Sequence, residues 1–351
     1  MAIFGSLVKK EALHIVRDTR TMIITLVMPL VLLLLFGFAI STEVNDVRLV
    51  AVVDHHTDET RTLLEKFRMN DYFSFLGLTT PDEAEKMLRS GETDAVLFLR
   101  IENDKIKAQI MADAANPTNA QSVTAYVNGV ISGTGNKTPV LTYTLYNPQM
   151  KSSYNFVPGI MGMIFILICA IMTSVSIVRE KENGTMNLLL VSPIKPATII
   201  LGKLVPYFLL SCVILSIMLL ISYTLLGLPV SSSIINVVLL SFLYITLSLS
   251  FGLLVSTIAE SQLTALIGSA VILMLPIIML SGMIFPVDNM PVILQGVSCL
   301  IPARWYISAM KKLMIQQLDM SYILEEIIIL FSMTILLLAF SIKKFYSSSR
   351  K

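Results

Sequence analysis

Residues 156–192 read FVPGIMGMIFILICAIMTSVSIVREKENGTMNLLLVS, and this stretch decides the fold class. Residues 156–178 are apolar for long enough to cross a membrane, since a helix needs roughly 20 residues to span about 30 Å of hydrocarbon. The charged run at residues 179–182 ends the apolar stretch, because burying ionised groups in lipid costs about 2.5–3.5 kcal/mol each. The sequence therefore predicts a membrane-spanning helix followed by a charged turn at a membrane surface.

Five further apolar stretches are long enough to cross a membrane. The chain of 351 residues is 55% hydrophobic and 14% charged, whereas soluble globular proteins carry about 25% charged residues. This composition excludes a disordered chain, a coiled coil and an ordinary cytosolic enzyme. We expect a polytopic α-helical membrane protein with six transmembrane helices, at residues 22–40, 156–178, 204–226, 234–258, 263–284 and 323–342.

The charged residues are concentrated between the first and second spans. Residues 41–155 hold 26 of the chain's 50 charged residues. Strand-like apolar runs alternate there with helical segments, which is typical of an α/β domain. We expect strands near residues 47–53, 72–78, 95–99 and 106–111, and helices near residues 57–69, 81–89 and 117–131.

Lysine and arginine near the ends of the spans predict the orientation. With a cytoplasmic N-terminus, 12 of these residues lie on the cytoplasmic side and three in the short outside loops. Cytoplasmic loops carry the excess of Lys and Arg, so both termini are predicted to be cytoplasmic and residues 41–155 extracytoplasmic. A cleaved signal peptide ending near Ser41 is the alternative, but the apolar stretch of 19 residues exceeds a signal core of about 7–15.

The remaining segments, residues 1–21 and 156–351, complete the expected domain organisation. Residues 1–21 place apolar and basic residues at helical spacing, as in a helix lying at the cytoplasmic interface. A solvated anchor that follows the positive-inside rule is an equally simple interpretation. Residues 156–342 form a five-helix transmembrane domain, and residues 343–351 a cytoplasmic tail. The charged residues singled out in the interfacial helix are Lys10, Glu11, Arg17, Asp18 and Arg20.

Residues 285–306 are apolar but are interrupted too often by proline to form a seventh span. Non-helical backbone at membrane depth must be covered by protein or line a cavity. The segment therefore fits a re-entrant loop that closes the outer end of a pathway. The candidate gate residues are Pro286, Pro291, Pro302 and Trp305.

Two pairs of neighbouring side chains have a simple and a functional interpretation. The rings of Trp305 and Tyr306 are explained by anchoring at the membrane interface. Glu325 and Glu326 suggest a cation path if they lie inside the membrane. They reach the surface if the last span begins near Ile327, and we favour that interpretation.

Neither a catalytic nor a metal-binding constellation is apparent in the sequence. His55-His56 is the only pair of histidines, and no Cys or third His follows at ligand spacing. We expect no catalytic residue, no bound metal or cofactor, and no nucleic-acid partner.

Short motifs follow one another in a characteristic order. They are Lys10-Glu11 with Arg17-Asp18-Thr19-Arg20, Asn147-Pro148, Phe156-Val157-Pro158-Gly159, Arg179-Glu180-Lys181-Glu182 with Gly184-Thr185, Ser192-Pro193, Gly202-Lys203, Ser281-Gly282-Met283-Ile284-Phe285-Pro286 and Pro302-Ala303-Arg304-Trp305-Tyr306. On these motifs the chain resembles the membrane subunits (permeases) of type-2 ATP-binding cassette (ABC) exporters. It is most similar to the multidrug-efflux-like subgroup that carries a large extracytoplasmic domain after the first helix. Thr19 replaces the usual Pro, and Ser192 stands where Thr is commoner.

The resemblance implies a transporter subunit rather than an enzyme. The permease would form the pathway for a hydrophobic or amphipathic compound, drug-like or lipid-like, in a bacterial inner membrane. A separate ABC ATPase subunit would hold ATP and Mg and supply the energy, and no Walker A motif occurs in this sequence. A second permease copy or a paralogue would complete the pathway, and a periplasmic adapter protein is a further candidate partner.

The resemblance also assigns the coupling role to residues 179–203. In the family this segment docks into a groove of the ATPase and passes its motion to the spans. The alternative is that its charges only set the topology, although two acids within the run argue against this. The residues carried over are Arg179, Glu180, Lys181, Glu182, Gly184 and Thr185.

A function of another class is also compatible with the sequence. A membrane-anchored envelope sensor or scaffold would use residues 41–155 to bind a ligand. An ion-coupled carrier would need paired intramembrane ionisable groups and inverted repeats, and neither is clear.

Overall fold

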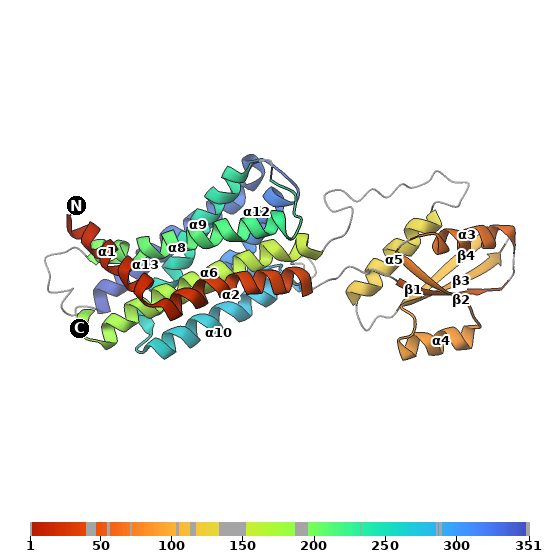
Figure 1. The fold of residues 1–351 in the computed structure, drawn as a ribbon, viewed down its shortest axis with the longest axis horizontal. Coiled ribbons are helices and arrows are strands. Elements are labelled where there is room, and N and C mark those ends of the chain that lie inside the picture. Colours follow the sequence, from red (N-terminus) through yellow and green to blue (C-terminus); the bar gives the residue numbers. More distant parts are fainter. Residues whose placement is uncertain are drawn as a thin grey trace. The chain divides into compact units, whose positions relative to one another are not determined.

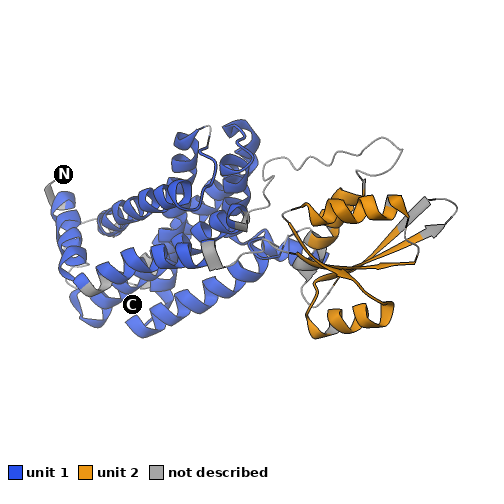
Figure 2. Cartoon of the chain, turned by 45° about the vertical axis from the view of Figure 1, so that its right-hand side comes forward, with its two compact units in different colours: residues 1–40, 152–351 blue, residues 41–151 orange. Residues whose placement is uncertain are grey.

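The structure is a computed structural model. It describes residues 2–39, 47–54, 57–70, 72–102, 105–112, 117–132, 152–186, 196–231, 233–285, 287 and 290–348. Two compact units account for the chain (Figure 2). Residues Met1–Ile40 and Ser152–Lys351 form a helical unit, and Ser41–Lys151 form a second unit.

Each of the six apolar stretches corresponds to one long helix of the helical unit. These helices are α2 (Thr19–Ala39), α6 (Ser152–Glu182), α8 (Pro196–Thr224), α9 (Ile234–Ile258), α10 (Gln262–Leu280) and α13 (Leu324–Ser348). Shorter elements accompany them: α1 (Ala2–Arg17), α11 (Val292–Ser298), α12 (Pro302–Met314) and the 3-10 turn η2 (Met320–Ile323). Among the described residues, five helices are long and apolar enough to cross a membrane, or up to seven if each bent pair counts as a span.

The two bent pairs differ from simple spans. α1 meets α2 at 69°, and α11 meets α12 at 87°. Pro302 stands at the start of α12, where the missing N–H of proline costs no hydrogen bond. The segment predicted as a re-entrant loop thus holds a short helix and the first turns of a second one, which continues to Met314.

α6 is the central helix of the helical unit. It packs against α2, α8, α9, α10 and α12, and Figure 1 shows it running along α2 and α10. Its side chains Val157, Ile160 and Met161 are fully buried. The Tyr244 hydroxyl of α9 donates to the Gly162 carbonyl at 2.9 Å, so a polar bond adds to this apolar contact.

The long helices run between two ends of the unit. We call one the Glu182 end, because Arg179 and Glu182 of α6 contact Gln262 at the start of α10 there. We call the other the Gly159 end, because Gly159 lies against Met283, just after α10. Gly37 near the end of α2 lies against Leu226, just after α8. α2 ends and α6 begins at this second end.

The second unit is an α/β domain, as the alternation of segments predicted. Its mixed sheet has the order β2-β1-β3-β4, from β1 (Val47–Val53), β2 (Phe73–Leu78), β3 (Ala95–Glu102) and β4 (Lys105–Ala112). β1 is parallel to β2 and β3, and β4 is antiparallel to β3. The helices are α3 (Asp58–Arg68), α4 (Pro81–Ser90) and α5 (Pro117–Ser132).

Alternate residues of β1 form the two cores of this unit. Leu49 and Ala51 pack with Phe67 of α3 and Val123 of α5 on one face. Val52 packs with Ala84 of α4 on the other, and Figure 1 shows α4 across the sheet from α3 and α5. Because side chains alternate along a strand, β1 can be buried on both faces. His55 and His56 lie outside the described residues.

Two of our sequence-based interpretations are wrong. Tyr306 is no interfacial anchor, because it is fully buried and stacks on Tyr244 with ring centroids 4.1 Å apart. Glu326 does not reach the surface: it is 3% exposed and pairs with Lys312 at 2.6 Å. Hydropathy could not reveal this, since the cation that stabilises the carboxylate comes from another helix. Glu325 is exposed, as expected.

A glycine pair tests the packing of α6 against α9. A Cβ atom at Gly252 would lie 2.6 Å from the Ala170 carbonyl oxygen, whereas one at Gly268 of α10 meets nothing within 4 Å. We expect Gly252→Ala to lower the free energy of unfolding by about 1–3 kcal/mol through overpacking. Gly268→Ala should be neutral or stabilising by up to about 1 kcal/mol, because Ala favours helix. Thermal unfolding of both purified variants measures the difference, and equal melting temperatures would contradict the packing.

Candidate functional site

The charged run 179–182 forms the last turn of α6 rather than a loop. The Asn183 amide donates to the Arg179 carbonyl at 3.0 Å, and the Gly184 amide to the Lys181 carbonyl at 3.1 Å. Gly184 has a φ of 70°, in the left-handed region that favours glycine. The glycine of the motif thus ends the helix. Residues 187–195, which include Ser192-Pro193 and belong to the segment predicted to couple to the ATPase, lie outside the described residues.

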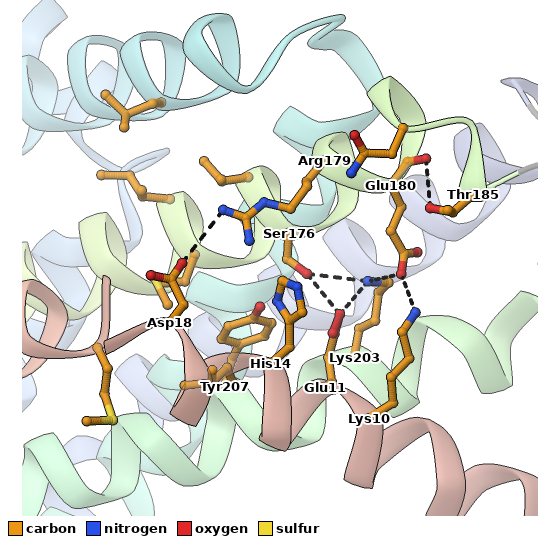
Figure 3. A pocket seen from close by; sticks show the side chains of 17 residues that line it. Lys10, Glu11, His14, Asp18, Ser176, Arg179, Glu180, Thr185, Lys203 and Tyr207 are labelled. Atoms are coloured by element: carbon orange, nitrogen blue, oxygen red, sulfur yellow. Dashed lines mark hydrogen bonds and ion pairs between the residues drawn. The ribbon is translucent and has the colours of Figure 1, made fainter. Parts of the chain in front are cut away.

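Three helices bring oppositely charged side chains together at the Glu182 end. We call this group the Lys203 cluster; it comprises Lys10 and Glu11 of α1, Ser176 and Glu180 of α6, and Lys203 of α8 (Figure 3). The motifs Lys10-Glu11, 179–182 and Gly202-Lys203 therefore meet in space. Glu11 and Lys203 are 192 positions apart in the sequence.

The Lys203 ammonium group is the centre of the cluster. It donates to the Glu11 carboxylate, lies 3.2 Å from Glu180 Oε1 and donates to Ser176 Oγ at 3.3 Å. A lysine ammonium has three protons, so these three acceptors can use all of them. Lys10 Nζ adds a second cation to Glu180 Oε1 at 2.9 Å.

Three charged members of the cluster are buried, which makes their pairing necessary. Glu11, Glu180 and Lys203 are only 5–8% exposed. Burial disfavours the charged form of Glu11, but the charge of Lys203 and hydrogen bonds from Lys203 and Ser176 favour it. Together they lower the pKa of Glu11 below its ordinary value. Glu11 thus contributes stability above its ordinary pKa, and this contribution is lost as the pH falls through the lowered pKa.

Gly202 explains why α1 can approach α8 closely. A Cβ atom at this position would lie 3.1 Å from the Leu7 Cβ of α1. Glycine at position 202 therefore lets the two helices pack, and the next residue supplies the ion pair. Both residues of the Gly202-Lys203 motif therefore have a physical role.

A second set of contacts joins the end of α6 to α9 and α10. Arg179 Nε donates to Gln262 Oε1 at 3.1 Å, and the Gln262 amide donates to Glu182 Oε1 at 2.8 Å. The Gln262 side-chain amide also donates to Glu182, and Lys181 donates to the Ser256 carbonyl. Since Gln262 is the first residue of α10, a displacement at the end of α6 would act directly on that helix.

Most of the other residues predicted for this site lie close by. Asp18 is 3.7 Å from Arg179 and so links the α1–α2 junction to α6. The Thr185 hydroxyl donates to the Glu180 carbonyl at 3.2 Å. Arg17 is exposed, and the side chain of Arg20 lies outside the described residues.

The candidate gate residues lie apart from this cluster, around α11 and α12. Pro291 precedes α11 and is exposed, whereas Pro302 begins α12 and is buried. The Trp305 indole N–H donates to the Cys299 carbonyl at 3.0 Å, and Arg304 lies over the indole ring at 5.1 Å. These contacts fix the bend between the two helices. Pro286 lies outside the described residues.

A family model described as "ABC-2 family transporter protein" matches residues 19–343 of the chain. The chain belongs to this family. It is therefore a membrane-embedded permease, which agrees with its five to seven candidate spans.

Relatives with assigned names cover most of the permease. "Probable multidrug ABC transporter permease YbhS" of Escherichia coli (strain K12) is 29% identical over 324 residues, 87% of this chain and 86% of the relative. "Probable multidrug ABC transporter permease YbhR" of the same strain is 26% identical over 338 residues, 91% of each chain. "Inner membrane transport permease YhhJ", also from that strain, is 28% identical over 218 residues, 57% of each chain.

Sequence reasoning missed three residues at the Glu182 end of the permease. Lys203 was counted only for topology and as part of a motif, and Ser176 and Gln262 were not singled out. A signal for Lys203 was present, because a lysine next to glycine at the start of an apolar span invites a search for a buried carboxylate. Nothing local marks Ser176 or Gln262, since both are uncharged.

Breaking the buried pair tests the Lys203 cluster. Lys203→Met leaves the Glu11 carboxylate buried with Ser176 and without its principal cation. We expect a loss of about 3–5 kcal/mol in the free energy of unfolding. The matched control is Lys10→Met, because the Lys10 side chain is 56% exposed and such a pair is worth at most about 1 kcal/mol.

Thermal unfolding of the purified permease measures both variants. The cluster predicts a far lower melting temperature for Lys203→Met than for Lys10→Met. If the two variants melted together, Lys203 would not be buried between Glu11 and Glu180.

Proposed function

We propose that the chain is the permease subunit of an ATP-driven ABC exporter, with its Glu182 end facing the cytoplasm. The observation that carries this proposal is the meeting of three charged motifs from α1, α6 and α8 at that end. A segment that receives force from an ATPase must be joined rigidly to the spans, and these ion pairs supply the junction.

Six membrane spans fit the path of the chain. α2, α6, α8, α9, α10 and α13 run alternately between the Glu182 end and the Gly159 end. α1 meets α2 at 69°, as expected of a helix lying along the cytoplasmic interface. The bent pair α11 and α12 would then be a re-entrant segment at the outer face, and the α/β unit would be extracytoplasmic. Both termini would lie in the cytoplasm of a bacterial cell.

Coupling to the ATPase is proposed for the exposed turn after α6. Asn183, Gly184 and Thr185 are exposed beside the end of that helix, so a docked subunit could press on them. Arg179, Lys181 and Glu182 would pass the displacement to α9 and α10 through Ser256 and Gln262. Glu180 would pass it to α1 and α8 through Lys10 and Lys203. ATP and Mg would be held by the ATPase, not by this chain.

The transported compound is proposed to be hydrophobic or amphipathic. Two relatives carry the word "multidrug" in their names. Wide apolar surfaces are exposed on α2 and α10, including Ile24, Met28, Val31, Ile272 and Leu275, and lipid or a second subunit must cover them. A second copy or a paralogue would complete the pathway. A periplasmic adapter is a further candidate partner for the α/β unit.

Charge reversal of Glu182 tests the coupling. In Glu182→Lys the α10 N-terminus loses the carboxylate that accepts the Gln262 amide, and a cation is brought to a helix N-terminus where it is unfavourable. We expect the purified permease–ATPase complex to lose most of its ATP-driven transport in proteoliposomes. The exposed position of Glu182 predicts a nearly unchanged melting temperature.

The control for charge itself is Glu325→Lys, which reverses an exposed carboxylate at the start of α13, toward the Gly159 end. Its complex should transport like the wild type. Normal transport by Glu182→Lys would refute the coupling role of the α6–α10 contact. Purification of the permease with a signalling kinase and without an ATPase would instead favour the sensor function.

A further inference from the structure

One side of α1 carries exposed charged and apolar residues that take no part in the Lys203 cluster. At 3.6 residues per turn these residues fall within an arc of about 100° on the helix. Glu11 lies on the opposite side of the helix and is buried. We call the exposed set the α1 outer face; it comprises Lys9, Leu13, Val16 and Arg17.

The acid and the cations of α1 lie on different sides of the helix. Its one acid, Glu11, is buried in the Lys203 cluster. Asp18, directly after the helix, lies 3.7 Å from Arg179. In the described part of the chain neither Lys9 nor Arg17 forms an ion pair with a carboxylate. The α1 outer face is therefore positively charged and open to an anionic partner.

Exposed apolar side chains on the neighbouring helices begin at the level of α1. Leu201 is exposed at the start of α8, directly before Gly202, which lies against Leu7 of α1. Ile23 and Ile24 are exposed near the start of α2. Because α1 meets α2 at 69°, it runs across the ends of the long helices rather than along them. Lipid that covers these apolar side chains of α2 and α8 would reach α1 as well.

A membrane interface matches both kinds of residue in the α1 outer face. Leu13 and Val16 are 43% and 61% exposed and gain from burial in the acyl region. The stems of Lys9 and Arg17 can lie along apolar surface while their charged groups reach the headgroups. Each Lys or Arg close to an anionic membrane surface strengthens binding about fivefold. A soluble anion would pair with the cations but leave the two apolar side chains in water.

We propose that the α1 outer face binds the headgroups of anionic phospholipids in the cytoplasmic leaflet, with Leu13 and Val16 entering the acyl region. Lys10 and Glu11 join α1 to α6 and α8, so the same contact would hold the Lys203 cluster at the membrane surface. The inference rests on the proposed function in taking the Glu182 end as cytoplasmic. The lipid contact itself needs neither ATP nor a partner subunit.

Photoactivatable lipids test this surface in the full chain. The permease is placed in nanodiscs of equal amounts of phosphatidylglycerol and phosphatidylcholine, and one of the two lipids carries a diazirine at the top of its acyl chain. Mass spectrometry gives the labelling of the α1 outer face and of a reference surface, Phe331 and Leu336, which are exposed on α13. We expect the ratio of phosphatidylglycerol to phosphatidylcholine labelling to be about 25-fold higher on α1, fivefold for each of its two unpaired cations.

Two pairs of variants separate the charge from the apolar contact. Lys9→Gln and Arg17→Gln should each lower the ratio on α1 about fivefold. The matched control Lys86→Gln removes an exposed cation from α4 and should leave the ratio unchanged. Leu13→Gln and Val16→Gln should lower labelling by both lipids and keep their ratio. All five side chains are exposed, and surface substitutions of this kind change the free energy of unfolding little.

Equal labelling ratios on α1 and α13 would overturn the preference for anionic lipid. If neither lipid labelled α1, its outer face would be open to solvent or to the ATPase, and the proposal would also fall. These outcomes are separate from those of the transport assay. A permease that shows the preference and does not transport would refute the exporter and leave the lipid contact standing. Transport by a permease without the preference would do the reverse.

Discussion

Lys203 places its ammonium group where α1, α6 and α8 meet, at a position almost closed to solvent. Two carboxylates and a hydroxyl share its three protons, so none of the partners can leave without uncovering a buried charge. The cluster thus fastens α1 and the start of α8 to the end of α6. The ordered end of α6 and the short distance between α1 and α8 at Gly202 both depend on it.

The same end of the molecule contains a second junction of different character. Glu182 and Gln262 are joined through exposed hydrogen bonds, which exchange with water at little cost. α6 thus has a buried, charged junction at the Lys203 cluster and an exposed, adjustable junction at Gln262. This combination suits a helix that must carry force. The first keeps the helices together, and the second lets α10 follow the motion of α6.

Hydropathy and periodicity predicted the helices and strands well, but they could not predict which side chains form ion pairs. α9 lies at Ile234–Ile258, where the apolar stretch placed it, and β1 lies at Val47–Val53. The burial of Glu11 and Glu326 was not predictable locally, because each is stabilised by a lysine from another helix. The charged run at 179–182 was predicted as a turn after the span for the same reason. Its charges are satisfied across helices, so the backbone stays helical through Glu182.

The central claim is that α1, α8 and the end of α6 move as one body when an ATPase acts on the permease. Spin labels at the exposed residues Phe4 and Leu209, on a background without the three native cysteines, report the separation of α1 from α8. Pulsed electron–electron double resonance should give the same distance distribution in the nucleotide-free and the ATP-trapped complex. In Lys203→Met the distribution should be broader. A distance that changes between the two states of the otherwise native complex would contradict the account.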